Sequence, residues 1–216
     1  MTDRISPGLW RLHVLTDRKT SRGRSHLQVA EAAIAGGADV LQLRDKEASS
    51  GPLYQEAMRL RKLTRDAQVP FIVNDRLDIA LAVDADGVHV GQSDLPASVV
   101  RRIMGPGKVL GVSVATVEEA LQAEKDGADY LGVGPVFEAR GTKPDTCEPM
   151  GLECIARIRR HCSLPIVAIG GIDEGNARKV REAGADGAAV ISAIVSADDI
   201  SQATRRLKRI LEETGK

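Results

Sequence analysis

The sequence predicts an alternating α/β fold that closes into a single (β/α)8 TIM barrel, and three observations carry this prediction. Short apolar runs of strand length alternate with helical patterns along the whole chain. The short runs are nearly continuous in apolar residues, as expected of parallel strands that are buried on both faces. A chain of 216 residues, 43% of them hydrophobic, can also bury a full core. We therefore expect one domain, 1–216, with loose ends at about 1–8 and 214–216.

Each expected element follows from its pattern of apolar and polar residues. The strands are expected at residues 9–15, 39–43, 71–74, 87–90, 109–113, 130–134, 166–169 and 188–192. The helices are expected at residues 25–35, 52–67, 77–83, 95–104, 117–126, 151–161, 173–183 and 198–213.

Three helices are followed by a shared pattern of small residues and Asp. It reads Ala-Gly-Gly-Ala-Asp at 35–39, Lys-Asp-Gly-Ala-Asp at 125–129 and Glu-Ala-Gly-Ala-Asp at 182–186. Glycine favours the left-handed turn that ends a helix before the next strand begins. We interpret these segments as structural and assign them no chemistry.

Composition restricts the kind of ligand. Thirty basic and thirty acidic residues balance, and no long apolar span is present, so the sequence implies neither a nucleic-acid nor a membrane partner. Aromatic residues make up only 2% of the chain, too few for stacking platforms, and we expect small-molecule substrates. The three cysteines, at 147, 154 and 162, lack zinc-site spacing. A reducing cytoplasm is the expected compartment, and the oligomeric state stays undetermined.

Two strand-like runs end in carboxylates, at Asp75 and at Asp94, with a short helix pattern between them. Mg²⁺ prefers carboxylate oxygens and usually binds through one or two of them together with substrate phosphate. The pair therefore indicates a magnesium site. The alternative is that each Asp caps the helix that follows it.

The active site of a TIM barrel lies at the carboxyl ends of its strands, so the polar residues that follow the strands should meet in one mouth. These residues are Gln42, Arg44, Lys46, Asn74, Asp75, Asp94, Ser113, Thr142 and Lys143. Basic side chains beside two acids suit a diphosphate, whose oxygens can be shared between Mg²⁺ and Arg or Lys.

A second anion site is expected where strands seven and eight end. Gly170 and Gly171 follow one strand, while Ile191 and Ser192 end the other. Barrels often bind phosphate at this place through backbone amides, which small residues leave accessible. The alternative for the glycines is a turn without function.

Several segments together resemble the thiamine-phosphate synthase family. They are Gln-Leu-Arg-Asp-Lys at 42–46, Val-Asn-Asp-Arg at 73–76, Gly-Val-His-Val-Gly-Gln-Ser-Asp at 87–94, Gly-Val-Ser at 111–113 and Ala-Ile-Gly-Gly-Ile at 168–172. They occur in the family's order over residues 12–195, and their combination is specific where any one would be weak. The resemblance implies that 4-amino-2-methyl-5-hydroxymethylpyrimidine diphosphate and a thiazole phosphate form thiamine monophosphate, with release of diphosphate.

The resemblance also implies roles for individual residues. The pyrimidine diphosphate would contact Gln42, Leu43, Arg44, Asp45, Lys46, Asn74, Ser113 and Lys143. The thiazole phosphate would contact Arg140, Gly141, Thr142, Gly171, Ile191 and Ser192. Asp75 and Asp94 would hold Mg²⁺. Among these residues, Arg44, Lys46, Ser113 and Lys143 would be catalytic, with the cations stabilising charge on the departing diphosphate.

One loop departs from the family pattern, which reads Pro-Thr-x-Thr-Lys after an aromatic residue. Here Phe137 is followed by Glu-Ala-Arg-Gly-Thr-Lys at 138–143, which is one residue longer and has one Thr fewer. We hypothesise that Arg140 compensates for the missing Thr.

Two other functions remain open from the sequence. A related thiazole tautomerase would share the barrel without needing the metal and diphosphate site, but a His is expected after strand five, where Val114, Ala115 and Thr116 stand. A non-catalytic barrel that binds phosphate ligands is the second alternative. His89, inside an apolar strand, is interpreted as a hydrogen-bonded core residue.

Overall fold

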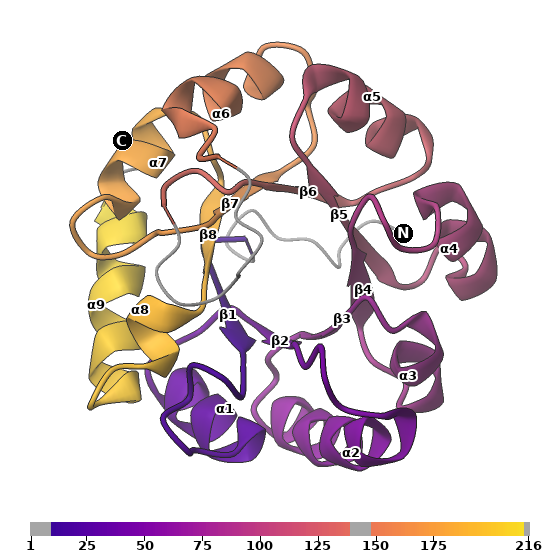
Figure 1. Ribbon diagram of the computed structural model, residues 1–216, viewed down its shortest axis with the longest axis vertical. Helices are drawn as coiled ribbons and strands as arrows, with labels where there is room; N and C mark the ends of the chain where they lie inside the picture. Colours follow the sequence, from indigo (N-terminus) through magenta and orange to yellow (C-terminus); the bar gives the residue numbers. More distant parts are fainter. Residues whose placement is uncertain (1–9, 139–147, 214–216) are drawn as a thin grey trace.

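The computed structural model describes residues 10–138 and 148–213, in which eight parallel strands pair in sequence order and close on themselves. Figure 1 shows the strands as an inner ring and the helices as an outer ring. The strands are β1 (Leu12–Thr16), β2 (Val40–Leu43), β3 (Phe71–Asn74), β4 (Gly87–Val90), β5 (Val109–Val114), β6 (Tyr130–Val133), β7 (Ile166–Ile169) and β8 (Gly187–Val190). The predicted TIM barrel is confirmed.

The helices cover the outside of this barrel. They are α1 (His26–Ala35), α2 (Ser50–Asp66), α3 (Leu77–Ala82), α4 (Ala97–Met104), α5 (Val117–Lys125), α6 (Gly151–Arg159), α7 (Ala177–Glu182), α8 (Ser192–Val195) and α9 (Ile200–Glu213). Within the described residues, none is long and apolar enough to cross a membrane.

The helix termini agree with the signals in the sequence. Ser25 caps α1: its hydroxyl accepts from the Gln28 amide at 3.2 Å, and the Gln28 side chain accepts from the Ser25 amide at 2.9 Å. Gly37, Gly127 and Gly184, which follow α1, α5 and α7, have φ angles of 94°, 86° and 104°. Their left-handed conformation confirms the predicted turns.

Helix α8 was not predicted, because four residues are too few to show a helical period. Helix α7 begins at Ala177 and not at the predicted 173. The side chains of Asp173 and Asn176 instead bond backbone amides of this segment, at 2.8 and 2.9 Å, and so hold a turn before the helix.

Four aspartates, which we call the clamp aspartates, join the strands in pairs at the amino end of the barrel. They are Asp39, Asp86, Asp129 and Asp186, just before β2, β4, β6 and β8. Each donates its amide to the carbonyl of the first or second residue of the preceding strand, over 2.8–3.0 Å. Each carboxylate also accepts that residue's amide, over 2.7–3.0 Å. The clamp thus satisfies backbone groups that would otherwise lack partners at the strand starts.

A basic side chain from the helix layer completes each clamp. Arg61 of α2 lies 2.7 Å from Asp86, and Arg101 of α4 lies 2.6 Å from Asp129. Arg159 of α6 lies 3.2 Å from Asp186, while Lys208 of α9 lies 2.6 Å from Asp39. The same device therefore recurs four times around the ring.

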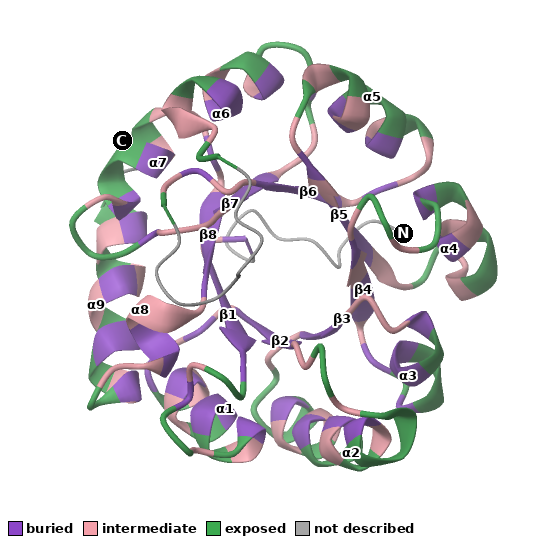
Figure 2. Cartoon of the chain, viewed as in Figure 1, coloured by how far each residue is buried: buried purple, intermediate pink, exposed green. Residues whose placement is uncertain are grey.

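Two apolar layers stabilise the barrel. Between strands and helices, side chains such as Leu41, Val88 and Leu131 are fully buried, and Figure 2 shows the buried faces of the helices turned toward the strands. Inside the barrel, a smaller cluster includes Trp10 and Tyr130, whose ring centroids lie 4.6 Å apart. The few aromatic residues of the chain are thus partly used to fill the barrel floor.

Candidate active site

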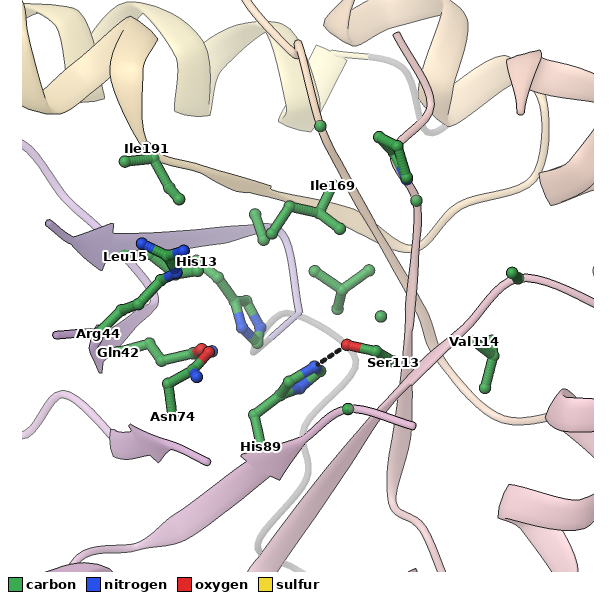
Figure 3. Close-up of a pocket in the computed structure, with 18 of the residues that line it drawn as sticks. His13, Leu15, Gln42, Arg44, Asn74, His89, Ser113, Val114, Ile169 and Ile191 are labelled. Atoms are coloured by element: carbon green, nitrogen blue, oxygen red, sulfur yellow. Dashed lines mark hydrogen bonds between the residues drawn. The ribbon is translucent and has the colours of Figure 1, made fainter. Parts of the chain in front are cut away.

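A cavity of about 740 Å³ opens at the carboxyl ends of the strands, where barrel active sites lie. The predicted site residues that line it are Gln42, Arg44, Lys46, Asn74, Asp75, Asp94, Ser113, Gly171, Ile191 and Ser192. Figure 3 shows several of these side chains directed toward a common space from different strands. The structure therefore brings most of the predicted residues into one mouth.

Asp75 lies at the end of β3 in a tight, left-handed turn. Its φ is 61°, its amide donates to the His89 carbonyl at 2.8 Å, and the Arg76 amide donates to the Asn74 carbonyl at 2.7 Å. Non-glycine residues rarely adopt this conformation, and such strain concentrates at functional sites. The turn directs the Asp75 carboxylate into the mouth, where it forms an ion pair with Lys46.

The two predicted metal ligands interact electrostatically. Burial raises the pKa of Asp75, Lys46 opposes that rise, and the Asp94 carboxylate adds to it. The Asp94 carboxylate is fixed by the Gly91 amide at 2.7 Å. Arg76 occupies the N-cap position of α3 and Pro96 that of α4, so neither aspartate caps the helix that follows it. The capping alternative is therefore excluded for both.

Arg44 extends from the end of β2 and forms an ion pair with Asp17, which follows β1. Only 11% of the Arg44 side chain and 6% of the Asp17 side chain are exposed. Sequence reasoning did not include Asp17 in the site, although its place just after a strand was a usable signal. The pair holds the guanidinium at the rim of the cavity.

Ser113 is held by two hydrogen bonds at the end of β5. His89 Nε2 lies 2.9 Å from its Oγ, and Gln92 donates to its carbonyl at 2.7 Å. His89 Nδ1 lies 2.9 Å from the hydroxyl of Tyr130. The interpretation of His89 as hydrogen-bonded is thus confirmed, but its ring also lines the cavity.

His13 is a further lining residue that sequence reasoning missed. It is fully buried, and neither ring nitrogen has a hydrogen-bond partner among the described residues. Burial lowers its pKa to about 3, and His89 contributes to the decrease. The only signal in the sequence for this placement was that His13 and Leu15 are two positions apart on β1 and so face the same side of the strand.

Leu43 and Asp45 lie apart from the cavity. Leu43 packs in the layer between strands and helices. Asp45 accepts from the amides of Glu47 and Ala48 at 3.0 Å each and lies 3.3 Å from His26 Nε2. Because alternate residues of a strand face opposite sides, the segment 42–46 directs only part of its side chains into the mouth.

The second predicted anion site lies where β7 and β8 end. Gly170 and Gly171 have φ angles of 99° and 63°, and a Cβ on Gly171 would lie 2.5 Å from the Glu138 carbonyl oxygen. The shape of the turn therefore requires glycine, whether or not a ligand binds there. Across from it, Ser192 begins α8, and the first amides of a helix have no partner within the helix.

Four predicted residues, Arg140, Gly141, Thr142 and Lys143, lie outside the described residues. Their proposed contacts with the thiazole phosphate and the diphosphate stay predictions.

A closed parallel barrel with acidic and basic side chains around a cavity at the carboxyl ends of its strands has the arrangement of a TIM-barrel enzyme. The family model for thiamine monophosphate synthase matches residues 12–194. The chain belongs to this family.

Relatives and a solved structure agree with that assignment. The chain is 59% identical over 205 residues to thiamine-phosphate synthase of Chloroflexus aurantiacus, covering 95% of this chain and 94% of the relative. The relative from Moorella thermoacetica, with the same name, is 53% identical over 94% of this chain and 96% of its own length. Thiamine phosphate pyrophosphorylase from Pyrococcus furiosus superposes with a TM-score of 0.88 at 43% identity, over 96% of this chain and 98% of that one.

Proposed function

We propose that this chain is a thiamine-phosphate synthase, a transferase that joins the pyrimidine diphosphate to the thiazole phosphate and releases diphosphate. The observation that carries the proposal is the mouth itself, in which Asp75, Asp94 and Lys46 lie beside a cavity large enough for ring-bearing substrates. The 59% identity to a relative with this name supports the same activity.

The acid pair fits Mg²⁺. Two carboxylates near each other repel, and in the structure Lys46 supplies positive charge to Asp75. Within the described part of the chain, no group of three or more His, Cys, Asp or Glu side chains forms a metal site. A two-carboxylate site that relies on substrate phosphate for further ligands is the common arrangement for this ion. Bound there, Mg²⁺ would supply Lewis-acid stabilisation of the diphosphate.

The protein's own cations would stabilise the leaving group. Lys46 is half-exposed and could turn from Asp75 to a diphosphate oxygen, while Arg44 is held at the rim by Asp17. Charge-assisted hydrogen bonds to phosphate are about twice as strong as neutral ones. We propose that both residues act on the charge that develops as the C–O bond to diphosphate breaks, and that Lys143 joins them.

The floor and the far wall of the cavity would position the two rings. Gln42, Asn74 and Ser113 offer polar groups to the pyrimidine, whose electron-rich ring stabilises the cation left when diphosphate departs. The thiazole phosphate would bind at Gly171, Ile191 and Ser192, so that the thiazole nitrogen faces that cation. The apolar side chains of Ile169 and Ile191 would help exclude water, the competing nucleophile.

Diphosphate release tests the proposal. The purified protein should release diphosphate with both substrates and Mg²⁺, and much less with either substrate alone or with a chelator. Binding of both ligands without any release would indicate the non-catalytic barrel. Conversion of a thiazole isomer without diphosphate chemistry would indicate the tautomerase. From the sequence we also propose a cytoplasmic location.

A further inference from the structure

Three side chains form a hydrogen-bonded row from the barrel floor to the mouth. The Tyr130 hydroxyl lies 2.9 Å from His89 Nδ1, and His89 Nε2 lies 2.9 Å from Ser113 Oγ. Figure 3 shows the second of these bonds at the cavity wall. Both Tyr130 and Ser113 line the cavity, and Tyr130 is only 1% exposed. The row therefore connects a nearly fully buried hydroxyl to the hydroxyl of Ser113 at the cavity wall.

The direction of the first bond follows from the burial of Tyr130. Burial raises the pKa of Tyr130 above its ordinary value, so its hydroxyl keeps its proton. A buried O–H group without an acceptor costs about 1–3 kcal/mol. His89 Nδ1 is the only hydrogen-bond partner of this hydroxyl within residues 10–138 and 148–213. The Tyr130 hydroxyl therefore donates, and Nδ1 accepts.

The second bond then has a fixed direction too. A histidine ring carries a hydrogen on at least one of its two nitrogens. Because Nδ1 accepts from Tyr130 and so carries none, the hydrogen is on Nε2, which donates to Ser113 Oγ. The hydrogen of Ser113 is left for a third partner. Gln92 holds the Ser113 carbonyl, so the residue is anchored at two points.

Glycines provide the space in which this row can form. A Cβ on Gly111 would lie 2.2 Å from Tyr130 Cζ and 2.4 Å from His89 Nδ1. A Cβ on Gly132 would lie 2.7 Å from His89 Cε1. No real side chain tolerates such contacts, so the inward faces of β5 and β6 are kept bare where the two rings meet. The row is thus built into three adjacent strands.

From this geometry we infer that Tyr130 and His89 are positioning residues that make Ser113 a hydrogen-bond donor to the ring substrate. The inference rests on the proposed function and deepens it. A neutral ring nitrogen or another atom with a free lone pair must then face Ser113. A substrate analogue that places C–H or N–H there would leave the donor unpaired and bind poorly.

The tautomer of His89 gives a direct test that needs no activity. NMR spectra of the protein, labelled with ¹⁵N at its four histidines, are recorded between pH 5.5 and 8. The His89 signals are assigned by their absence from the spectrum of His89→Gln. We expect the Nε2–H tautomer throughout, and a mixture of tautomers in Tyr130→Phe. An Nδ1–H tautomer or an imidazolium at pH 7 would overturn the inference.

Kinetics test whether Tyr130 acts through Ser113. We expect Tyr130→Phe to lower kcat/KM about tenfold, and Ser113→Ala to lower it further, with both variants remaining folded. Adding Tyr130→Phe to Ser113→Ala should have almost no further effect. The chain's other tyrosine, Tyr54 on α2, provides the control Tyr54→Phe, which should keep full activity.

Losses that add fully in the double variant would give Tyr130 a role independent of Ser113 and overturn the inference. The NMR result separates this failure from a failure of the proposed function. A protein with the Nε2–H tautomer but no diphosphate release would retain the hydrogen-bond direction and lose the substrate assignment.

Discussion

The two ends of the barrel both place aspartates beside basic side chains, and the two sets differ in how fully their hydrogen bonds are used. At the amino end, Asp129 accepts from both Leu110 and Arg101, and Arg101 also donates to three backbone carbonyls. At the carboxyl end, Asp75 has Lys46, whose side chain is 51% exposed. The charged groups at the amino end are thus paired with other groups of the protein, while those at the carboxyl end can still bind a ligand.

This difference separates stability from function along the barrel axis. None of the four clamp aspartates has a positive φ, and each one binds the start of a strand. Asp75 instead has a left-handed φ of 61°. Such backbone strain persists only because the surrounding structure holds it in place. Substitutions at the two ends should therefore change different measurements.

The largest effect is expected for Asp94→Ala, which removes one carboxylate of the proposed magnesium site. Activity should fall by about 10³-fold, because the charge on the departing diphosphate loses its metal. The thermal unfolding midpoint should stay close to that of the wild type. An active variant with unchanged Mg²⁺ dependence would show that Asp94 is not a metal ligand. It would also contradict the assignment of function to the carboxyl end of the barrel.

Lys46→Met comes next and removes a cation from the mouth while keeping its length. We expect about a 10²-fold loss in kcat/KM for the pyrimidine diphosphate, with the KM for the thiazole phosphate unchanged. Lys62→Met on the exposed face of α2 is the matched control and should behave as the wild type. Equal losses for both substrates would place Lys46 elsewhere than on the diphosphate.

At the amino end, Asp129→Ala should act on stability. The Leu110 amide loses its acceptor and Arg101 loses its partner, for an expected cost of about 2–3 kcal/mol in the free energy of unfolding. Urea unfolding measures this cost, while kcat should change less than twofold. Asp198→Ala, at a side chain that is 97% exposed, is the control and should leave the unfolding midpoint unchanged. A large loss of kcat in folded Asp129→Ala would contradict the division between the two ends.

The last expected effect depends on pH and concerns the histidines between the two ends. The pKa values of His13 and His89 are lowered to about 3 and about 4, against 6.5 for an ordinary histidine. Below pH 6.5 the unfolded chain binds protons that the folded chain does not, so stability falls as pH falls toward these values. Each histidine contributes up to about 1.4 kcal/mol per pH unit.

His13→Phe should reduce the dependence of the free energy of unfolding on pH, because it removes one of the two buried histidines. Urea unfolding at pH 7.5 and pH 5 in wild type and variant gives the slope. An identical slope in both proteins would mean that His13 is protonated as easily in the folded barrel as in the unfolded chain.

The sequence predicted the barrel because parallel strands buried on both faces leave a nearly continuous apolar run. It also predicted the mouth, because polar residues directly after such strands must meet at one end. The segment 42–46 shows the limit of reasoning by motif. Because side chains alternate along a strand, Leu43 must face the opposite side from Gln42. In the structure Gln42 lines the cavity, and Leu43 packs between the strands and the helices.

The hydrogen-bonded row could not be predicted from local pattern. Tyr130 and His89 are separated by 41 positions, and their contact depends on Gly111 and Gly132 lying across from the rings. A glycine in a strand signals that something approaches closely, but not what approaches. The missing partners of His13 are likewise visible only once neighbouring strands are placed.

The clamps also bear on how the chain folds. Three of the clamp ion pairs join residues 25, 28 and 27 positions apart, within single stretches of chain. The fourth joins Lys208 to Asp39, which are 169 positions apart. Closing so long a loop costs more conformational entropy, and contacts of this range form slowly. We therefore expect the first and last strands to pair last, so that barrel closure is the step most exposed to aggregation during synthesis.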